Sequence, residues 1–595
     1  MIFSLGLGIS LFIIVGDCSS PTEEYVVAPA ILDPAPYPEW AHYHWVWLSH
    51  DRAKQSSMIE YVQEYMKYDI KVGAVDIDSG WSTGYNNFIF NSKYPDPQDM
   101  VNFFHNNSIA IILWATSMVD TDSPNFNESY NKGYFIRDVF GKQVIFSWWH
   151  GKGGLLDYTN KEAVEWWHSQ MDEALKYGID GWKCDGTDPY ILELIVAKGK
   201  SGTVTRKEYS DYYYTDFYEY TRTKNGNNTL IMSRSVDGFG PIYLDFTPKK
   251  FTFAGWVGDA DPTFQGLEVV LKKYLQSAWA GYPNFGSDIG GYRVGKGDLG
   301  RTKELLIRWA QLGAFSPLME NGGNQEHRPW IFDNQTLEIY RQYVDIHYQL
   351  IPYLLTTGSD AYRHGTSSLT PLAAHNNFIE KYIDDFVPET YNYLLGKDIL
   401  VAPIHTNDTD NHPVEVKFPK DNNWISWWNS SVIYKGGETM KFKNIPLEMY
   451  MAFCKQGTII PLRVTEMTPH WGHHHNLIGH LRLLLHTPPV PVESPIVTEV
   501  TESNGHGVVA SYWMSDDSVL YINVTAHSIM NVVIEVHNTP GPVDTVIMHT
   551  TTTLQQVCPD MLVKEGTYHY CINTSSVYVH PLSNVLGTSL TMYFK

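Results

Sequence analysis

Charged side chains stand at the ends of several apolar stretches of this 595-residue sequence. The stretch GIDGWKCDGTDPY (178–190) begins like a buried strand and then carries Lys183, Asp185 and Asp188 within six residues. Another acidic residue, Asp259, follows the apolar segment AGWV (254–257). Two carboxyl groups in different protonation states can act as nucleophile and general acid on opposite sides of one bond.

Asp185 and Asp259 are the pair that we expect to do this chemistry. Lys183 lies two residues before Asp185, and its positive charge would keep that carboxylate ionised. Desolvation by the apolar residues before Asp259 would favour its protonated form. A retaining glycosidase needs such a pair about 5–5.5 Å apart. An aspartate can also be a helix N-cap, and Asp261, before PTFQGLE, fits that role better than Asp259.

The elements that must position these residues follow an alternating pattern from residue 37 to residue 365. Helices are expected between the strands, for example over 160–178 and 263–281. Short apolar stretches predict strands over 42–48, 72–78, 109–115, 179–185, 229–235, 251–257, 282–288 and 313–320. Eight strand–helix units predict an α/β fold, a (β/α)8 TIM barrel.

In such a barrel the active site lies at the C-terminal ends of the strands. The residues expected there are Asp76, Asp78, Trp114, Lys183, Asp185, Arg234, Asp259, Asp288 and Glu320. One charged strand end is ordinary, but a ring of them predicts a functional site. Trp114, Trp148, Trp149 and Trp256 can wall a pocket there. The segment WWHGKGG (148–154) is equally compatible with a pocket loop and a structural loop.

Two further all-β domains are expected after the barrel, at 366–480 and 481–595, because apolar and polar residues alternate there between Gly, Pro and Asn turns.

Residues 1–20 are typical of a secretory signal peptide, since the apolar stretch 2–16 is short for a bilayer span. N-x-S/T sequons, which fit a secreted glycoprotein, begin at Asn106, Asn127, Asn227, Asn334, Asn407, Asn429, Asn523 and Asn573. Cys558 and Cys571 can form a disulfide in an oxidising compartment, whereas Cys184 and Cys454 are expected to be buried free thiols.

The composition excludes some classes of partner. The formal net charge is −22 and no run of Lys or Arg occurs, so nucleic acids and anionic membranes are not expected partners. No Cys or His pattern indicates zinc. We expect no metal and no cofactor, and the oligomeric state is open.

Several motifs occur in one order along the chain: VDIDSGW, DGWKCDGTD, MSRS, GWVGD, GYPNFGSDIGGY, RWAQLGAFSPLM, GKDILVAPI and GTIIPL. From about residue 38 to 465 they resemble glycoside hydrolase family 31, the α-glucosidase and α-xylosidase family. The resemblance implies that Asp185 is the nucleophile and Asp259 the acid/base. It further implies that the sugar is bound by Asp78, Lys183, Arg234 and Asp288, with Trp256 shaping the pocket.

Two features depart from the family pattern. Family members usually carry a β-sandwich domain before the barrel, whereas only residues 21–41 separate the expected signal from the first strand here. Many family glucosidases also have an Arg-Asn-His run after the eighth strand, where this chain has Glu320 and Gly322. His327 can replace the missing sugar-binding histidine or be a surface residue. Asp188, where a Glu often follows the nucleophile, is expected to lie behind it.

The sequence therefore predicts a secreted retaining α-glycosidase that hydrolyses terminal α-linked sugars of an oligosaccharide or glycoside, like an α-glucosidase. An α-galactosidase, an α-xylosidase or a transglycosylase of the same family is an alternative. A non-catalytic carbohydrate-binding relative is the other alternative, and it would be favoured if Asp185 or Asp259 pointed away from the pocket or was blocked by a neighbouring side chain.

Overall fold

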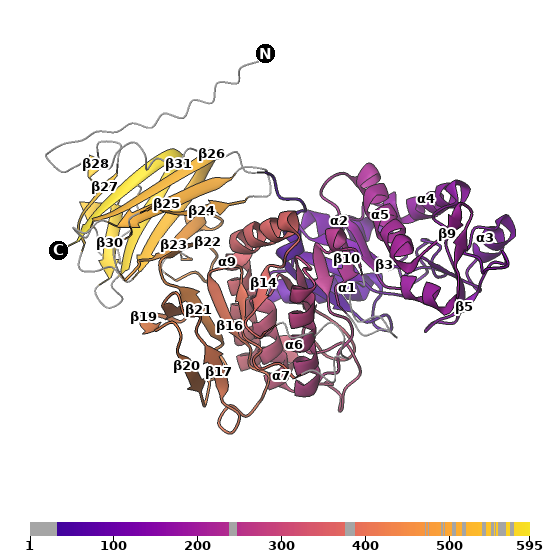
Figure 1. Cartoon of the computed structure of the whole chain (residues 1–595), viewed down its shortest axis with the longest axis horizontal. Coiled ribbons are helices and arrows are strands. Elements are labelled where there is room, and N and C mark those ends of the chain that lie inside the picture. The colour runs from indigo at the N-terminus through magenta and orange to yellow at the C-terminus, as the bar shows by residue number, and fades with distance from the viewer. Residues whose placement is uncertain are drawn as a thin grey trace, which may run out of the picture.

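The centre of the molecule is a closed barrel of eight parallel strands (Figure 1). The computed structural model describes residues 33–236, 247–374 and 387–469, and most of 472–594. Around the barrel, each strand pairs with the next and the last pairs with the first: β1 (His44–Leu48), β2 (Ala74–Ile77), β3 (Ala110–Ala115), β7 (Gly181–Cys184), β10 (Leu230–Arg234), β11 (Ala254–Trp256), β12 (Phe285–Asp288) and β13 (Leu318–Asn321). The predicted TIM barrel is confirmed.

Almost every residue of these strands is buried, as expected for parallel strands covered by helices on one side and by the barrel interior on the other. Seven of the expected strand ranges each contain one observed strand. The expected strand 313–320 was wrong in its first half, because residues 313 and 314 end helix α7 (Lys303–Ala314). In so short an apolar stretch, the spacing of apolar residues does not distinguish the end of a helix from the start of a strand.

Helices surround the barrel: α1 (Gln55–Lys67), α2 (Pro97–Asn106), α4 (Lys161–Leu175), α5 (Arg206–Asn225), α6 (Phe264–Trp279), α7, α8 (Pro329–Phe332) and α9 (Asn334–His364). The two helices expected at 160–178 and 263–281 are confirmed as α4 and α6. The N-cap of α6 is Thr263, whose side chain accepts from the backbone N–H of Gly266 at 3.0 Å. The expectation that Asp261 caps this helix was wrong. An N-cap side chain bonds the backbone N–H two or three residues later, and Thr263, not Asp261, is three residues before Gly266.

A small insertion between β3 and α4 lies at the end of the molecule opposite the C-terminal sheets (Figure 1). It contains α3 (Phe126–Lys132) and a three-stranded sheet ordered β4 (Met118–Asp120), β6 (Lys152–Leu155), β5 (Phe146–Ser147). Some of its apolar residues, among them Met118, Ile136 and Phe146, pack with Trp114 of the barrel in a cluster separate from the main core, while others such as Val119 and Phe135 join that core. The hairpin of β8 (Lys198–Gly199) and β9 (Gly202–Thr203) joins the insertion through backbone hydrogen bonds between Lys198 and Arg137.

The chain then forms an antiparallel sheet with a neighbouring antiparallel pair, and after it a larger sheet. One sheet is ordered β14 (Leu369–Pro371), β15 (Tyr393–Leu395), β16 (Ile399–Ala402), β21 (Met451–Lys455), β18 (Trp424–Ser426), β19 (Asn429–Tyr434), beside the pair β17 (Val414–Lys417) and β20 (Thr439–Phe442). The last sheet contains β22 (Thr458–Arg463), β23 (Leu481–His486), β24 (Ile496–Val500), β25 (Val508–Met514), β26 (Val519–His537), β27 (Val543–Met548), β28 (Thr552–Thr553), β29 (Gln555–Gln556), β30 (Thr567–Cys571) and β31 (Ser576–Phe594). This larger sheet is antiparallel except where β23 pairs with β26 and β29 with β30. Because β22 pairs with β23, this sheet begins before the boundary expected at 481.

Arg308 of α7 ties the barrel to the first of these sheets. Its buried guanidinium donates hydrogen bonds to the backbone carbonyls of Met449 at 2.7 Å, Ile445 at 3.0 Å and Pro446 at 3.1 Å. One barrel helix therefore satisfies the polar backbone of a loop in the following domain.

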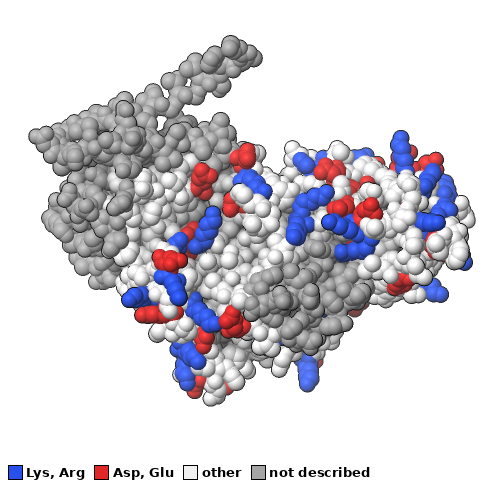
Figure 2. Space-filling view, in the orientation of Figure 1, with Lys and Arg blue, Asp and Glu red and all other residues white. Residues whose placement is uncertain are grey.

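The cysteines and the charged surface were also predicted from the sequence. Cys184 and Cys454 are buried free thiols, as expected, and Cys558 lies outside the described residues. On the face in Figure 2, basic and acidic side chains of the described residues are interspersed. Within the described ranges, no helix is long and apolar enough to cross a membrane.

Candidate active site

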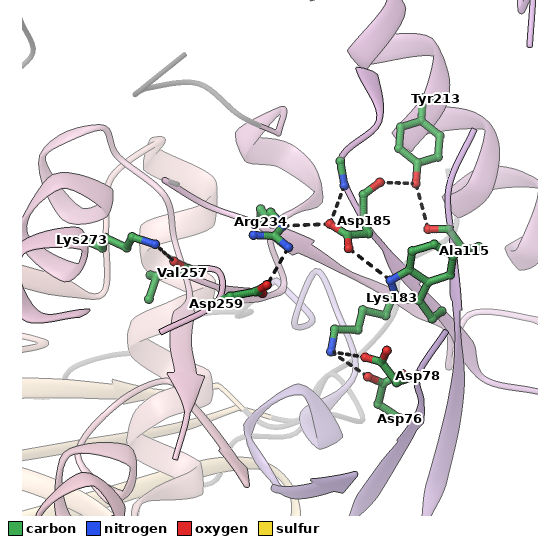
Figure 3. A network of polar contacts seen from close by, with 12 residues as sticks. Asp76, Asp78, Ala115, Lys183, Asp185, Tyr213, Arg234, Val257, Asp259 and Lys273 are labelled. Atoms are coloured by element: carbon green, nitrogen blue, oxygen red, sulfur yellow. Dashed lines mark hydrogen bonds and ion pairs between the residues drawn. The ribbon is translucent and has the colours of Figure 1, made fainter. Parts of the chain in front are cut away.

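The residues predicted to be catalytic or to bind sugar lie on a barrel strand or within three residues after one, at the C-terminal end of the barrel, whereas Trp148 and Trp149 lie between β5 and β6 of the insertion. Asp185 follows β7 and accepts hydrogen bonds on both carboxylate oxygens (Figure 3). Oδ1 accepts from the backbone N–H of Gly186 at 2.7 Å and from Nε of Arg234 at 2.8 Å, and Oδ2 accepts from Nε1 of Trp114 at 3.2 Å. Burial raises the pKa of Asp185, but the charge and hydrogen bond of Arg234, together with the Gly186 N–H and the more distant Lys183 charge, outweigh burial and hold the pKa below its usual range.

Arg234 also reaches the second carboxylate of the predicted pair. Its Nη2 lies 3.4 Å from Oδ1 of Asp259, whose side chain is about one-third exposed. Before Asp259, Gly258 adopts a positive φ of 78°, a conformation that favours glycine and turns the chain at the end of β11. One guanidinium from β10 therefore joins carboxylates from the two neighbouring strands, as Figure 3 shows.

A second ion-pair network lies deeper in the barrel and is centred on Lys183. Its Nζ is 2.8 Å from Oδ2 of Asp76 and 3.2 Å from Oδ2 of Asp78. The ammonium group also lies near the indole rings of Trp47, 4.2 Å from the centroid, and Trp256, 5.2 Å from the centroid. Burial disfavours the charged lysine, but the two carboxylates outweigh burial and raise the pKa of Lys183 well above its usual value.

This network corrects one expectation about Lys183 and bears on a second. Sequence proximity predicted that Lys183 keeps Asp185 ionised, but Arg234 makes the ion pair with Asp185 and Lys183 contributes a weaker charge. Lys183 was also expected to bind sugar. Its side chain is only 5% exposed and its ammonium holds the carboxylates of Asp76 and Asp78, and its contact with sugar stays a prediction.

The same lysine faces more carboxyl groups than it can neutralise. Glu320 of β13 is fully buried with Oε1 3.9 Å from Nζ of Lys183, and burial raises its pKa to about 7 against the pull of the lysine. Burial likewise raises the pKa of Asp76 to about 8. Asp288, which pairs in register with Glu320, has a pKa well above its usual value because of burial and the Glu320 charge. Protons are therefore retained in this cluster near neutral pH.

The remaining predicted residues divide between the predicted sugar site and its support. Asp78, Asp288 and Trp256 are buried at the strand ends, where the predicted sugar site lies. Trp114, expected to wall the pocket, donates its indole N–H to Asp185. Asp188 is fully buried and pairs with Nε of Arg206 at 3.1 Å, and its place behind Asp185 stays a prediction.

The alternative that His327 lies on the surface was wrong. His327 is 2% exposed, and burial lowers its pKa well below the usual value. Its Nδ1 lies 3.0 Å from Oδ1 of Asn321, and its backbone carbonyl accepts from Nδ2 of Asn321 at 3.0 Å. The residue packs against the end of β13.

Sequence reasoning missed two groups that the structure brings to the site. Asp76 was placed at the strand end but not among the binding residues, although it makes the shorter contact with Lys183. Tyr85 and Asp120 were not considered, and both contact the WWHGKGG loop. The spacing in VDID (75–78) could have indicated Asp76, because residues two apart on a strand face the same side, so Asp76 and Asp78 do. No local pattern signalled the others.

No group of three or more His, Cys, Asp or Glu side chains among the described residues is arranged to hold a metal ion.

Comparisons with known proteins agree with this architecture. The family description "Glycosyl hydrolases family 31 TIM-barrel domain" matches residues 34–357, and "Glycosyl hydrolase family 31 C-terminal domain" matches residues 371–460. A solved structure of the Flavobacterium johnsoniae GH31 dextranase complexed with glucose superposes with a TM-score of 0.79 at 21% identity, covering 94% of this chain and 71% of that chain.

Curated relatives share the same region. Alpha-glucosidase 2 of Bacillus thermoamyloliquefaciens is 27% identical over 457 residues, and an alpha-xylosidase of Emericella nidulans is 24% identical over 444 residues. Each alignment covers 72% of this chain and 54% of the relative, so the chain spans about half the length of these relatives. Because the TIM-barrel family model matches more than half of the chain, this protein belongs to glycoside hydrolase family 31.

Proposed function

We propose that this protein is a retaining α-glycosidase that hydrolyses terminal α-linked sugars by double displacement, with Asp185 as nucleophile and Asp259 as acid/base. The observation that carries the proposal is the shared contact of both carboxylates with Arg234. Two carboxylates that contact one guanidinium lie near each other at the strand ends, which supports their action on a single glycosidic bond, and retention requires them to be about 5–5.5 Å apart. A non-catalytic carbohydrate-binding protein is the second candidate, because a neighbouring side chain that blocks a carboxylate would favour it and Arg234 contacts both carboxylates.

The two steps follow from the charges. Asp185 is held ionised by Arg234, and its carboxylate attacks the anomeric carbon while Asp259 gives a proton to the leaving oxygen. Asp259 then takes a proton from water, whose oxygen attacks the same carbon and releases Asp185. Since the contact with Arg234 favours an ionised carboxylate, Asp259 must leave this guanidinium before it acts as an acid.

The buried acidic end of the pocket supports a neutral polyhydroxylated substrate. Asp78 and Asp288 supply carboxyl groups for sugar hydroxyls, and an anionic substrate would meet further negative charge. The named relatives include α-glucosidases and α-xylosidases, so we propose an α-glucoside or α-xyloside as the first substrates to test, with α-galactosides in the same panel.

The test combines nitrophenyl α-glycosides with two variants. We expect wild type to cleave at least one substrate and to release the α-anomer first, as seen by NMR. Asp185→Ala should lose about 10⁴-fold or more in kcat, and azide should restore turnover with formation of the β-glycosyl azide. Asp259→Ala with azide should instead give the α-glycosyl azide, because azide then attacks the covalent intermediate.

The stereochemistry of these products assigns the two roles. An inverted first product from wild type, or full activity of Asp185→Ala, would contradict the mechanism. Asp188→Asn is the matched control: it changes a neighbouring buried aspartate that we place behind the site, and azide should not rescue any loss it causes.

We also propose that the protein enters the secretory pathway. The sequon residues Asn106, Asn127, Asn227, Asn334, Asn407 and Asn429 are all exposed, which supports glycosylation, whereas residues 1–20 lie outside the described part of the chain. Expression in a eukaryotic host should give a protein that begins near residue 21 and that loses mass on treatment with an N-glycosidase. An intact N-terminus without glycans would contradict this.

A further inference from the structure

The guanidinium of Arg301 binds two loops at the C-terminal end of the barrel. Arg301 lies just before α7 and is 6% exposed. Its Nε donates to the carbonyl of Gly290 at 2.9 Å, and its Nη2 donates to the carbonyls of Gly291 at 3.1 Å and Asn324 at 2.9 Å. Its Nη1 donates to the carbonyl of Glu326. The glycines lie in the loop after β12 and the other two acceptors in the loop after β13, so one buried cation joins both loops.

The two glycines allow a closer approach than any other residue would. A Cβ on Gly290 would lie 2.8 Å from Cδ of Arg301, and a Cβ on Gly291 would lie 2.8 Å from the backbone carbonyl oxygen of Asp261. The glycine pair therefore touches the arginine at one residue and the backbone near Asp259 at the next. Burial lowers the pKa of Arg301 to about 10, which leaves the guanidinium charged at neutral pH.

The loop after β12 in turn holds the loop that carries Asp259. The backbone N–H of Arg293 donates to the carbonyl of Ala260 at 3.0 Å, one residue after Asp259 in the chain. A continuous series of hydrogen bonds and backbone contacts therefore runs from Arg301 through residues 290–293 to the loop of the proposed acid/base. Moving that loop would break hydrogen bonds to a buried charge, which are among the stronger ones in a protein.

We propose that Arg301 is a positioning residue for acid/base catalysis: by fixing residues 290–293, it holds Asp259 where its proton reaches the leaving oxygen. This rests on the proposed function, since it takes Asp259 as the acid/base. Asp259 must leave Arg234 before it acts as an acid, and its place then depends on the loop that carries it. Proton transfer is lost steeply when donor and acceptor move apart, so support of this loop is support of the chemical step.

The test compares two substrates of the same sugar that differ in their need for an acid. One is an α-linked disaccharide, whose leaving sugar oxygen needs a proton, and the other is the chloronitrophenyl α-glycoside, whose phenolate leaves without one. For Arg301→Met we expect kcat/KM to fall about 100-fold on the disaccharide and less than about 5-fold on the aryl glycoside. Similar losses on both substrates, or no loss on either, would overturn the role of Arg301.

Arg308→Met is the matched control for lost stability, because Arg308 is also a buried arginine that binds loop carbonyls, but those of the following domain. It should change kcat/KM on the two substrates by the same factor. Arg301→Lys keeps the charge but not the forked geometry, and it should lose less than Arg301→Met, again mainly on the disaccharide. If Arg301→Met did not fold, Arg301→Lys would decide the question by the same comparison.

Two measurements separate this inference from the proposed function. Asp259→Ala should lose far more on the disaccharide than on the aryl glycoside, and equal losses would show that the acid/base assignment itself is wrong. Hydrogen exchange examines the loop whatever the enzyme cleaves. In Arg301→Met the amide N–H of Arg293 should exchange at least about 10-fold faster than in wild type or Arg308→Met. Unchanged exchange would overturn the link between Arg301 and the Asp259 loop.

Discussion

The Nε atom of Arg234 lies 2.8 Å from Oδ1 of Asp185, and this ion pair sets the charge of the candidate nucleophile. The two residues are 49 positions apart in the sequence and meet because β7 and β10 are neighbours in the barrel. The contact matters because a buried carboxylate without a cation would be protonated near neutral pH and would not attack carbon.

Replacing this cation should therefore move the acidic limb of the pH–rate profile. In Arg234→Gln, burial of Asp185 is no longer opposed, its pKa rises, and activity is lost at a higher pH as the solution is acidified. We expect kcat/KM plotted against pH to show an acidic limb at higher pH than in wild type, with a lower maximum. Arg293→Gln, which changes an exposed arginine paired with Asp261, should leave the limb in place. An unshifted limb in Arg234→Gln would show that other groups hold Asp185 ionised.

Removing the deeper cation should act mainly on stability. Lys183→Met leaves Asp76, Asp78 and Glu320 without their shared counter-ion, and we expect the free energy of unfolding to fall by about 3–5 kcal/mol. The loss should be larger at pH 8 than at pH 5, because protonation relieves the repulsion at low pH. Lys161→Met, at a side chain that is 90% exposed, should change stability by no more than about 0.5 kcal/mol. Urea denaturation at the two pH values measures both effects.

The acidic cluster should also make the wild-type protein less stable as pH rises from acidic to neutral. Glu320 has a pKa raised from 4.5 to about 7, and Asp76 from 3.8 to about 8. Between the unfolded and folded values the folded state holds more protons, so the free energy of unfolding decreases with increasing pH. Thermal melts between pH 5 and pH 8 should show a falling Tm, and Glu320→Gln should flatten the slope. A Tm that rises across this window would refute the assignment.

Arg308 should be necessary for docking of the first C-terminal sheet. Arg308→Met leaves buried carbonyls of the 445–449 loop without donors, and we expect a loss of about 3 kcal/mol and faster proteolysis within that loop. Arg308→Lys, which keeps the charge but not the forked geometry, should lose less. If Arg308→Met unfolded at the wild-type urea midpoint, these hydrogen bonds would contribute nothing to docking.

Much of this protein could be predicted from local pattern. Alternation of apolar stretches with amphipathic ones predicts the barrel, because parallel strands and covering helices have different periods. The strand ends predict where Asp78, Asp185, Arg234 and Asp288 gather, because strands of one direction end on one face. The error at residues 313–317, where a strand was expected, arose because the spacing of apolar residues in a short stretch is the same for a helix end and a strand.

The identity of the ion pairs was decided only by tertiary structure. Sequence proximity paired Lys183 with Asp185, but Lys183 reaches to β2 and Asp185 takes its cation from β10. The WWHGKGG loop was equally compatible with two roles, and the fold separated them by burying Trp148 and leaving Trp149 exposed. Residue types and their place on a strand are properties of the chain, whereas the partner of each charge depends on which strands the closed barrel makes neighbours.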